Sequence, residues 1–350
     1  MRLNLKPDLH FFEHVQDPVT PKIWITIVNY RTAKLAIDCL RSIAEQIAET
    51  SNLRAIVIDN ASGDRSVEEL TAFVEGEGWQ TWVSVVSLDR NGGFAFGNNV
   101  GIVKSLRSPE NVDYIMLLNP DTLVQDGAIR ALLEFMESHE AVGIAGSHLQ
   151  NAVGRPESSA HNAPSPLGEL VAGARLGALD GVLQRYVVTP PIRRDAHPCD
   201  WVSGASLIVR RKVFDDVGLL DEGYFLYFEE VDFCRRAKKA GWEIWFVPES
   251  RIVHFEGSST GIRKIAQRRP GYWYDSRRRY FVKHFGVLGL VAADILWVIG
   301  RSSLLLRRAL RLGSGGAAQD PKWFTLDLVW GDLRALLTGA IWRIGREPRP

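Results

Sequence analysis

Asp121 closely follows an apolar run of strand length, Tyr114 to Leu118, with a proline at position 120. A run of this kind predicts a strand buried on both faces of a sheet, ending at Asp121. Ligands of open α/β sheets bind at the carboxyl edge, where a carboxylate is suited to hold a metal ion. An Asp in this position also begins many turns and helices, so its role depends on the residues that accompany it.

A second acidic group opens a helical pattern near Glu229. On a helix starting there, Glu230 shares a face with apolar residues such as Phe233, which predicts an inward-pointing carboxylate suited to a general base. Asp232 lies one turn before Arg236 and is predicted to form a salt bridge with it. Favourable electrostatics at the start of a helix is the alternative explanation for this acidic turn.

A histidine, His254, interrupts a short apolar run from Ile252 to Phe255. A lone histidine in such a run is more often a core or turn residue than a metal ligand. Beside Asp121 it would place an imidazole next to a carboxylate, a set that suits Mn or Mg bound to a diphosphate. The metal hypothesis therefore requires Asp121 and His254 to lie close together.

The elements that would position these residues alternate between strand and helix patterns. Apolar runs at 23–28, 55–58 and 83–86 predict strands, and helical periodicity or a glycine-rich loop and helix follows each of them. This order predicts an α/β fold with a mostly parallel central sheet and helices on both faces.

Three polar loops follow strands of this sheet and are predicted to converge at one edge. They contain Asn29 with Tyr30 and Arg31, the segment from Asp59 to Ser62, and the segment from Asn119 to Asp121. Short polar side chains at the carboxyl edge of a parallel sheet are suited to bind a nucleotide. For Asp59 alone, a helix N-cap or a turn is an equal alternative to nucleotide contact.

Several other classes of protein are disfavoured. The glycine-rich loop has its glycines at 92, 93 and 97, which miss the G-x-G-x-x-G spacing of dinucleotide-binding enzymes, and no P-loop motif is present. Three cysteines without C-x-x-C spacing argue against a zinc site or a disulfide framework. The first twenty residues lack a continuous apolar run, so a cytoplasmic location without a signal peptide is expected.

Several motifs, taken in order, resemble those of family 2 glycosyltransferases. The similarity is to the bacterial rhamnosyltransferase-like and galactofuranosyltransferase-like branch, and it covers residues 22 to 285 approximately. It rests on Asp59 with Asn60, Asn91 to Asn99, Leu118 to Asp121, Trp201 to Ala205, Glu229 to Asp232, and His254. Each motif is weak alone, but their order makes a chance match improbable. The resemblance implies the GT-A fold and inversion of configuration at the transferred sugar.

The resemblance assigns roles to individual residues. Glu230 matches the catalytic base. Asp121 matches the metal-binding acid of the family's Asp-x-Asp motif, in which Asn119 replaces the first acid here, and His254 matches a histidine that completes the metal site in some members. The nucleotide-contacting positions are Asn29, Tyr30, Asp59, Asn60, Asn91, Gly93 and Asn119. The pocket for the donor sugar and the acceptor contains Trp201, Ser203, Gly204 and Glu229.

These roles imply an inverting glycosyl transfer with Mn or Mg as the cofactor. By resemblance alone, dTDP-rhamnose is the first choice of donor, and the acceptor is a glycan or a polyprenyl-linked saccharide in cell-surface polysaccharide synthesis. A UDP-sugar carrying galactofuranose or an N-acetylhexosamine is the alternative donor. A sugar-nucleotide nucleotidyltransferase is a further alternative, but it would need a basic glycine-rich loop where this chain has Asn29-Tyr30-Arg31-Thr32. A non-catalytic sugar- or nucleotide-binding protein would not need Glu230.

The chain is predicted to have three parts: an N-terminal extension (1–21), a catalytic domain (22–262) and a basic, mainly helical module (263–350). Within the catalytic domain, 22–150 is expected to bind the nucleotide and 151–262 the acceptor. The whole chain has a net charge of +1, whereas residues 263–350 contain 17 Lys and Arg against 6 Asp and Glu, a net of +11.

The basic module contains two apolar segments. Val287 to Ile299 is apolar apart from Asp294, which makes it too short and interrupted to predict a membrane span of about 20 residues. Farther on, one helical stripe comprises Leu326, Trp330, Leu333, Leu337, Ile341 and Ile344, flanked by basic residues that include Arg343 and Arg346. Charge and nearby tryptophans favour peripheral attachment to anionic lipid on the inner face of the cell membrane. Packing against the catalytic domain is the alternative, and no nucleic-acid partner is expected because no nucleic-acid motif is present.

Overall fold

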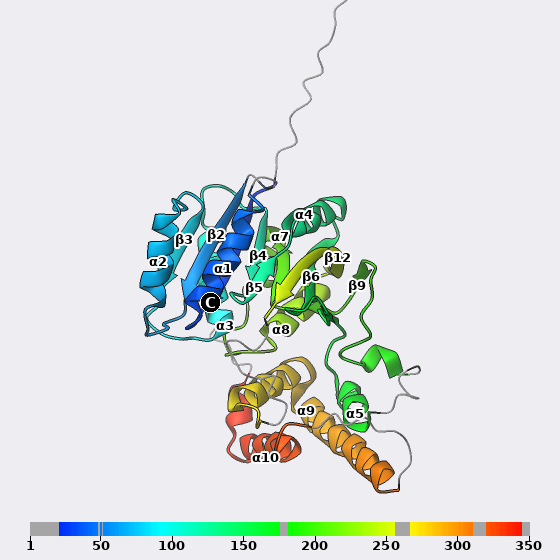
Figure 1. The fold of residues 1–350 in the computed structure, drawn as a ribbon. Coiled ribbons are helices and arrows are strands. Elements are labelled where there is room, and N and C mark those ends of the chain that lie inside the picture. Colours follow the sequence, from blue (N-terminus) through cyan, green and yellow to red (C-terminus); the bar gives the residue numbers. More distant parts are fainter. Residues whose placement is uncertain are drawn as a thin grey trace, which may run out of the picture.

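The structure is a computed structural model that describes residues 21–47, 50, 52–175, 181, 183–255, 267–310 and 320–344. Figure 1 shows an α/β part above a smaller group of helices. Residues 1–20 of the predicted N-terminal extension lie outside the described residues. The predicted domain boundary at residue 262 and the basic residue Arg346 also lie outside them.

A ten-stranded mixed sheet forms the centre of the α/β part. Its main path runs β3 (Val83–Ser87), β2 (Leu53–Asp59), β1 (Ile23–Asn29), β4 (Tyr114–Leu118), β11 (Ser206–Arg210), β6 (Val142–Gln150), β12 (Glu243–His254) and β5 (Thr122–Val124). The predicted strands β1 to β4 are parallel, as are β6 and β12, whereas β11 runs antiparallel to both neighbours. The short strands β7 (Pro156–Glu157) and β9 (His197–Pro198) join its margin, and β8 (Ala160–His161) pairs with β10 (Trp201–Val202).

Helices cover both faces of this sheet, as predicted. Those on one face are α1 (Ala33–Ala44), α2 (Ser66–Gly76) and α4 (Ala128–Ser138); those on the other are α3 (Phe94–Leu106), α7 (Arg211–Val217) and α8 (Glu229–Lys239). Strand β4 shows why: Met116 and Leu118 pack into the first core, and Ile115 and Leu117 into the second, all at most 1% exposed. Successive strand residues point to opposite faces, so a strand covered on both sides is apolar throughout.

The strand that leads to Asp121 is shorter than predicted, because β4 ends at Leu118 rather than at Asp121. A turn follows, in which the Thr122 hydroxyl donates to the Asn119 carbonyl at 2.7 Å, and the chain re-enters the sheet as β5. Strand β5 pairs antiparallel with the end of β12, with Thr122 opposite His254. This pairing, which local sequence patterns do not reveal, brings His254 beside Asp121.

The C-terminal helices form the predicted helical module. Helix α9 (Gly271–Ala309) changes direction at Gly286 (φ 72°, ψ 178°) and is followed by α10 (Phe324–Leu337) and the short helix η2 (Ala340–Arg343). Helix α9 packs closely on α5 (Pro166–Ala174), which precedes the short helix η1 (Gln184–Tyr186). A Cβ atom at Gly300 would lie 2.5 Å from the Leu170 carbonyl oxygen, so glycine permits this close approach.

Part of the positive charge of the module is buried rather than exposed to solvent. Arg277 is 1% exposed and contacts Glu169, Asp294 and Asp332, with nitrogen to oxygen distances of 3.4, 3.0 and 3.2 Å. Two further arginines, Arg278 and Arg301, are also buried in ion pairs. The expectation that the net charge of this region is available to lipid is therefore wrong in part, because these cations hold the helices to each other and to α5.

The apolar stripe of α10 faces outward. Leu326, Trp330, Leu333 and Leu337 are 41 to 77% exposed, while Ile341 in η2 is fully buried and Ile344 is partly buried. Packing against the catalytic domain is thus wrong for the first four residues, because α10 buries another face that contains Phe324, Leu328 and Ala335.

The apolar segment of α9 is longer than the sequence suggested. Of the described helices, α9 has the length and composition needed to cross a membrane, and 17% of its apolar window is buried. Its charged interruptions are paired, Asp294 with Arg277 and Arg301 with Asp320, and the helix continues beyond Ile299 to Ala309. The segment from Val287 to Ile299 is therefore part of a helix whose length and composition suit a membrane span, which those residues alone did not indicate.

Candidate active site

The ends of β1 and β2 are joined by a polar network around Asp59. Asn29 lies opposite Asp59 in the ladder, and its amide donates to the Asp59 carboxylate at 2.8 Å. The backbone N–H and the hydroxyl of Ser62 donate to the same carboxylate at 3.0 and 2.6 Å. Asp59 therefore forms the turn considered from the sequence and organises two of the loops predicted to bind a nucleotide. Its direct contact with a nucleotide stays a prediction.

Tyr30 stands at the outer side of this network. Its side chain is accessible, with 37% of the residue exposed, and the Arg31 guanidinium carbon lies 5.1 Å from the centre of its ring. Arg31 is held in turn by Ser62, whose hydroxyl accepts from the Arg31 backbone N–H at 2.8 Å. An exposed aromatic ring beside a fixed polar network is suited to stack on a planar ligand.

The glycine-rich loop is held to this edge by Asn60. The Asn60 amide donates to the Asn91 side-chain oxygen and to the Gly93 carbonyl, both at 3.0 Å. On the other side of the loop, the Phe94 N–H donates to the Phe225 carbonyl at 2.8 Å. Gly93 has φ 89°, and a Cβ atom there would lie 2.1 Å from the Phe225 oxygen, so only glycine fits between these partners.

The proposed metal residues do lie together. His254 Nε2 is 3.3 Å from Asp121 Oδ1 and 3.5 Å from Asn119 Nδ2, and the Asp121 and His254 residues are 5 and 8% exposed. Within the described residues, the buried Asn119 Oδ1 has no hydrogen-bond partner. An imidazole, a carboxylate and an amide oxygen suit Mn or Mg when a diphosphate supplies further oxygens. These residues therefore fit a divalent ion whose remaining ligands include oxygens of the substrate diphosphate.

No group of three His, Cys, Asp or Glu side chains able to hold a metal occurs in the part of the chain that the structure describes. A metal at Asp121 and His254 would therefore depend on donor phosphates and water for the rest of its coordination shell, which is the usual situation for Mg at phosphate sites.

The acidic pair lies at the start of α8. Tyr227 and Phe228 adopt left-handed backbone conformations (φ 71° and 70°) and turn the chain into the helix. Glu230 lies against Gly204: a Cβ atom there would be 3.7 Å from Glu230 Cβ and Cγ, and equally far from the Phe94 ring. Gly204, Glu230 and the head of α3 thus meet at one point, beside the loop that contains Gly93.

Burial raises the pKa of the Glu230 carboxyl from its ordinary value to about 7. The pKa of Glu229 is raised further, by burial and then by the negative charge of Glu230. A hydrogen bond between the two groups lowers the pKa of Glu230 and raises that of Glu229. Because the pKa of Glu230 lies near neutral pH and that of Glu229 is raised by the charge of its neighbour as well as by burial, Glu230 is the member of the pair suited to act as a base.

One oxygen of each carboxyl group, Oε2, is buried and has no hydrogen-bond partner among the described residues. A buried polar atom without a partner is costly in a site that serves only stability, and it marks a position for a ligand or water. Asp232, the next acidic residue of α8, forms the ion pair predicted from the sequence: Arg236 Nε donates to its carboxylate at 2.8 Å.

The remaining predicted pocket residues hold their own loop together. The Trp201 indole N–H donates to the Asn162 carbonyl at 3.0 Å, and its ring stacks on His161 with centroids 4.1 Å apart. The backbone N–H of Ser203 donates to the Ser159 carbonyl at 2.9 Å. These bonds fix the approach to Gly204, and contact of Trp201 or Ser203 with a sugar stays a prediction.

The contacts of two contributors could not be predicted from the sequence. Phe225 contacts the glycine loop through its carbonyl oxygen, which any residue possesses. The Asn99 amide donates to the Leu220 carbonyl at 2.9 Å and accepts from the Leu220 N–H at 3.0 Å. The partners are far apart in the chain, so only the folded structure shows that Asn99 supports the segment leading to Glu230.

The fold and the arrangement of this site define a GT-A nucleotide-sugar transferase architecture. A profile of the family described as "Glycosyltransferase like family 2" matches residues 21–275, and the chain belongs to this family.

Its curated relatives include rhamnosyltransferases. The N-acetylglucosaminyl-diphospho-decaprenol L-rhamnosyltransferase of Mycobacterium tuberculosis is 34% identical over 180 residues, which cover 46% of this chain and 57% of that protein. Rhamnosyltransferase WbbL of Escherichia coli is 28% identical over 166 residues, 47% of this chain and 61% of WbbL. The chain therefore spans a little over half the length of these relatives.

Solved structures share the fold at low sequence identity. A mannosyltransferase from Pyrobaculum calidifontis in complex with GDP-Man and Mn2+ has a TM-score of 0.52 at 14% identity, covering 94% of this chain and 82% of that one. GalNAc-T7 with UDP, GalNAc and Mn2+ has a TM-score of 0.54, also at 14% identity, covering 91% and 58%. These similarities confirm the predicted GT-A fold.

Proposed function

We propose that the protein is an inverting, metal-dependent glycosyltransferase that moves rhamnose from dTDP-rhamnose to a hydroxyl group of a lipid-linked saccharide. The observation that carries the proposal is the position of Glu230, a partly exposed residue with one buried carboxyl oxygen, against Gly204 and Phe94 at the junction of the glycine-rich loop and α8. The rhamnosyltransferases among its relatives support the choice of donor. The decaprenyl-linked substrate in the name of the mycobacterial relative supports the choice of acceptor.

The residues suggest a single displacement. An acceptor hydroxyl is a weak nucleophile at neutral pH, so Glu230 would accept its proton as the oxygen attacks the anomeric carbon of the donor. The bond from that carbon to the diphosphate breaks in the same step, and the nucleoside diphosphate leaves with the bonding electrons. Attack opposite the leaving group inverts the anomeric carbon.

Asp121 and His254, with the Asn119 side-chain oxygen beside them, would hold a Mn or Mg ion. When bound, such an ion stabilises the charge of a departing diphosphate as a Lewis acid. The network of Asn29, Asp59 and Ser62 would bind the base and ribose of the donor, with Tyr30 stacked at its margin.

A panel of dTDP-, UDP- and GDP-sugars tests this proposal. Release of nucleoside diphosphate is measured with Mn or Mg, with and without a polyprenyl-diphosphate N-acetylglucosamine acceptor, and the product linkage is read by NMR. Release of dTDP with an inverted linkage supports the proposal, whereas UDP release would select the alternative donors. In a separate reaction with a nucleoside triphosphate and a sugar 1-phosphate, release of pyrophosphate would instead identify a nucleotidyltransferase. Donor binding without any product in either reaction would identify a binding protein.

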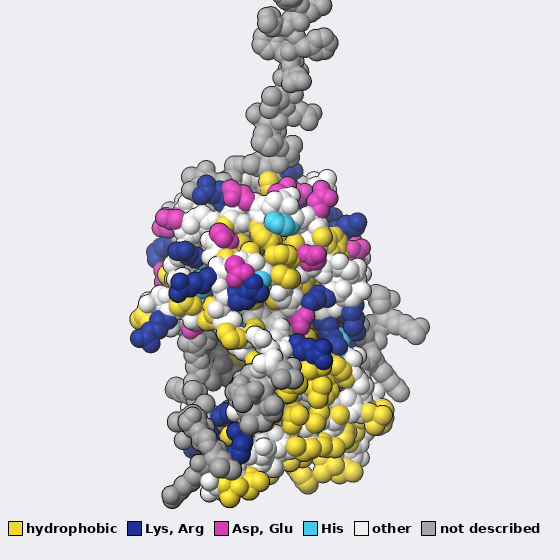
Figure 2. Space-filling model, turned by 90° about the vertical axis from the view of Figure 1, so that its right-hand side faces the viewer, with side chains coloured by type: hydrophobic (Ala, Val, Ile, Leu, Met, Phe, Trp, Pro, Cys, Tyr) yellow, Lys and Arg dark blue, Asp and Glu magenta, His cyan; other side chains and the backbone are white. Residues whose placement is uncertain are grey.

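The exposed faces of α9 and α10 support a second part of the proposal, peripheral attachment to a membrane. Figure 2 shows hydrophobic side chains gathered over the lower part of the molecule, where these helices lie. The exposed large hydrophobic residues of α9 are Leu288, Ile295, Val298, Ile299, Leu305 and Leu306. Those of the α10 region are Trp323, Leu326, Trp330, Leu333, Leu337 and Trp342. An apolar surface with tryptophans is suited to the headgroup boundary of a bilayer.

The positive charge of this region adds little support for an anionic bilayer, because Arg277, Arg278 and Arg301 are buried. Lys322 and Arg334 are exposed beside the stripe of α10. Flotation with liposomes tests the attachment. The variant Leu326→Asp/Leu337→Asp should lose binding to anionic vesicles, while Val153→Asp, a control at an exposed apolar residue of the α/β part, should bind as the unchanged protein does. Unchanged flotation of the double variant would refute attachment through this face.

A further inference from the structure

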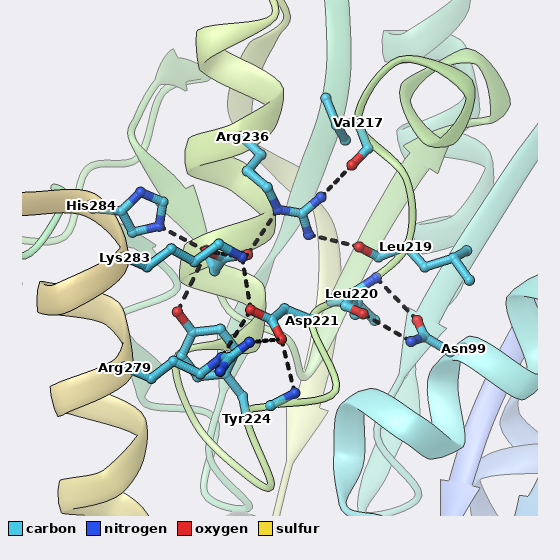
Figure 3. Close-up of polar contacts among 12 residues, drawn as sticks. Asn99, Val217, Leu219, Leu220, Asp221, Tyr224, Arg236, Arg279, Lys283 and His284 are labelled. Carbon is cyan, nitrogen blue, oxygen red and sulfur yellow. Dashed lines mark hydrogen bonds and ion pairs between the residues drawn. The ribbon is translucent and has the colours of Figure 1, made fainter. Parts of the chain in front are cut away.

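The first half of α9 grips the segment that leads into the acidic helix. At the start of that segment, Asp221 accepts from Arg279 Nε and Nη2 at 2.9 and 2.6 Å (Figure 3). Lys283 Nζ donates to the same carboxylate at 2.8 Å. The Asp221 side chain is only 5% exposed, so these bonds form in a largely dry environment, where charge-assisted hydrogen bonds are strong.

On α8 itself, Asp232 has no exposed surface and lies two residues after Glu230. Its carboxylate accepts from Arg236 Nε at 2.8 Å, from Lys283 Nζ at 3.1 Å and from His284 Nε2 at 2.7 Å. Burial raises the pKa of Asp232, but the His284 hydrogen bond and the charges of Arg236 and Lys283 outweigh it and hold the pKa well below its usual range. Asp232 is therefore ionised and rigidly held at neutral pH.

Lys283 is the residue that these two carboxylates share, since its ammonium group bonds to both Asp221 and Asp232. The segment between Asp221 and Asp232 contacts the glycine-rich loop that contains Gly93. Its Phe225 carbonyl accepts from the Phe94 N–H at 2.8 Å, and its Leu226 carbonyl accepts from the Ser276 hydroxyl of α9 at 3.0 Å.

This segment also follows a costly backbone path. Tyr227 and Phe228, the last residues before α8, have φ angles of 71° and 70°. Left-handed backbone at residues with a Cβ atom is strained and persists only where surrounding contacts impose it. The contacts that hold both ends of the segment come from α9, so the position of Glu230 depends on residues of the C-terminal module.

We propose that Lys283 is a positioning residue for the transfer reaction. By joining Asp221 to Asp232, it fixes the segment that directs Glu230 toward Gly204 and the glycine-rich loop. The proposal rests on the proposed role of Glu230 as the base. Lys283 touches no reacting atom and acts through the two aspartates. A displacement of about 1 Å at a reacting group lowers a rate by about 100-fold, so a small rotation of α8 is sufficient to impair transfer.

The test is Lys283→Met in the full chain, which removes the shared ammonium group and keeps an apolar side chain of similar length. We expect kcat to fall about 10- to 100-fold. The Kd for dTDP, measured by fluorescence titration, should stay within about twofold, because the bonds of Lys283 to Asp221 and Asp232 hold the segment before α8, whereas the Asn29 and Asp59 loops that would bind dTDP are joined by their own hydrogen bond. Lys283→Arg, which retains a cation able to reach two carboxylates, should recover most of the activity.

The matched control is Lys238→Met. Lys238 lies on α8 itself, but its ammonium group bonds to the partly exposed Asp200 and the Cys199 carbonyl rather than to the segment before α8, so its loss should leave kcat unchanged. Thermal melting followed by circular dichroism checks that each variant folds. If Lys283→Met does not fold, Ser276→Ala removes a single bond to the same segment and should lower kcat severalfold at unchanged dTDP affinity.

A Lys283→Met variant with the kcat of the unchanged protein would overturn the positioning role, and so would a parallel loss of kcat and dTDP affinity, which would indicate general damage. If Lys283→Met does not fold, a Ser276→Ala kcat equal to that of the unchanged protein overturns it as well. These outcomes leave the proposed function intact. If the unchanged protein releases no nucleoside diphosphate with any donor, the proposed function fails and the positioning role fails with it.

Discussion

The pH dependence of transfer follows directly from the environment of Glu230. Its pKa is raised to about 7 by burial, and it can accept a proton only when ionised. Activity should therefore be complete above pH 7 and fall as the pH drops through 7. At pH 5, about 1% of the base is ionised, so kcat should be about 100-fold lower than at pH 8, with a slope of about tenfold per pH unit below the midpoint.

Two matched variants assign this midpoint to one of the neighbouring carboxyl groups. Glu230→Gln removes the base and should lower kcat by about 10² to 10⁴ at every pH, with donor affinity retained. Glu229→Gln keeps a hydrogen-bonding side chain of the same size beside Glu230 and leaves the burial that raises the pKa of Glu230, so it should retain kcat within about tenfold and keep the midpoint near 7.

The assay is nucleoside diphosphate release at saturating donor and acceptor, in buffers of constant ionic strength from pH 5 to 8.5. Circular dichroism at each pH excludes unfolding as the cause of lost activity. A midpoint near 4.5, the ordinary value for a glutamate, would refute the argument that burial tunes this group. Loss of activity in Glu229→Gln with retention in Glu230→Gln would exchange the two roles.

Three further predictions concern Gly93, Asp121 and Asp232, which lie in or support the proposed site. Gly93→Ala should destabilise the fold by about 1 to 3 kcal/mol and weaken dTDP binding, because a Cβ atom collides with the Phe225 carbonyl; thermal melting and titration measure both. Asp121→Asn should lower Mn-dependent kcat by about 10² to 10³ and weaken Mn binding, measured by calorimetry with dTDP present. Asp232→Asn should cost about 3 to 5 kcal/mol of unfolding free energy in urea at pH 7, since it removes the buried carboxylate that pairs with Arg236 and Lys283.

The stability prediction has a definite sign with pH. Because the folded-state pKa of Asp232 is lowered, its contribution to stability is present above the ordinary Asp value and is lost as the pH falls below that value. The difference in unfolding free energy between Asp232→Asn and the unchanged protein should therefore shrink on acidification. A difference that does not change between pH 7 and pH 3 would contradict the burial of an ionised carboxylate.

Local sequence patterns were sufficient to predict much of the fold. The apolar run at β4 is strand-like because its side chains enter two cores on opposite faces, and such a run can be recognised without tertiary information. Its end could not be predicted, since the Thr122 hydroxyl and the pairing of β5 with β12 decide where the strand stops. The order of the motifs was sufficient to indicate the family, which the profile match to residues 21–275 confirms.

By itself, the sequence determined the alternation of strands and helices and the residue types able to do chemistry. Periodicity and turn residues are local properties, so they are readable along the chain. Only the tertiary structure decided that His254 lies beside Asp121, that the α10 stripe is exposed, and that Lys283 joins Asp221 to Asp232. These outcomes depend on which distant elements pack together, and a positive charge in the sequence does not reveal whether it will meet lipid or a buried carboxylate.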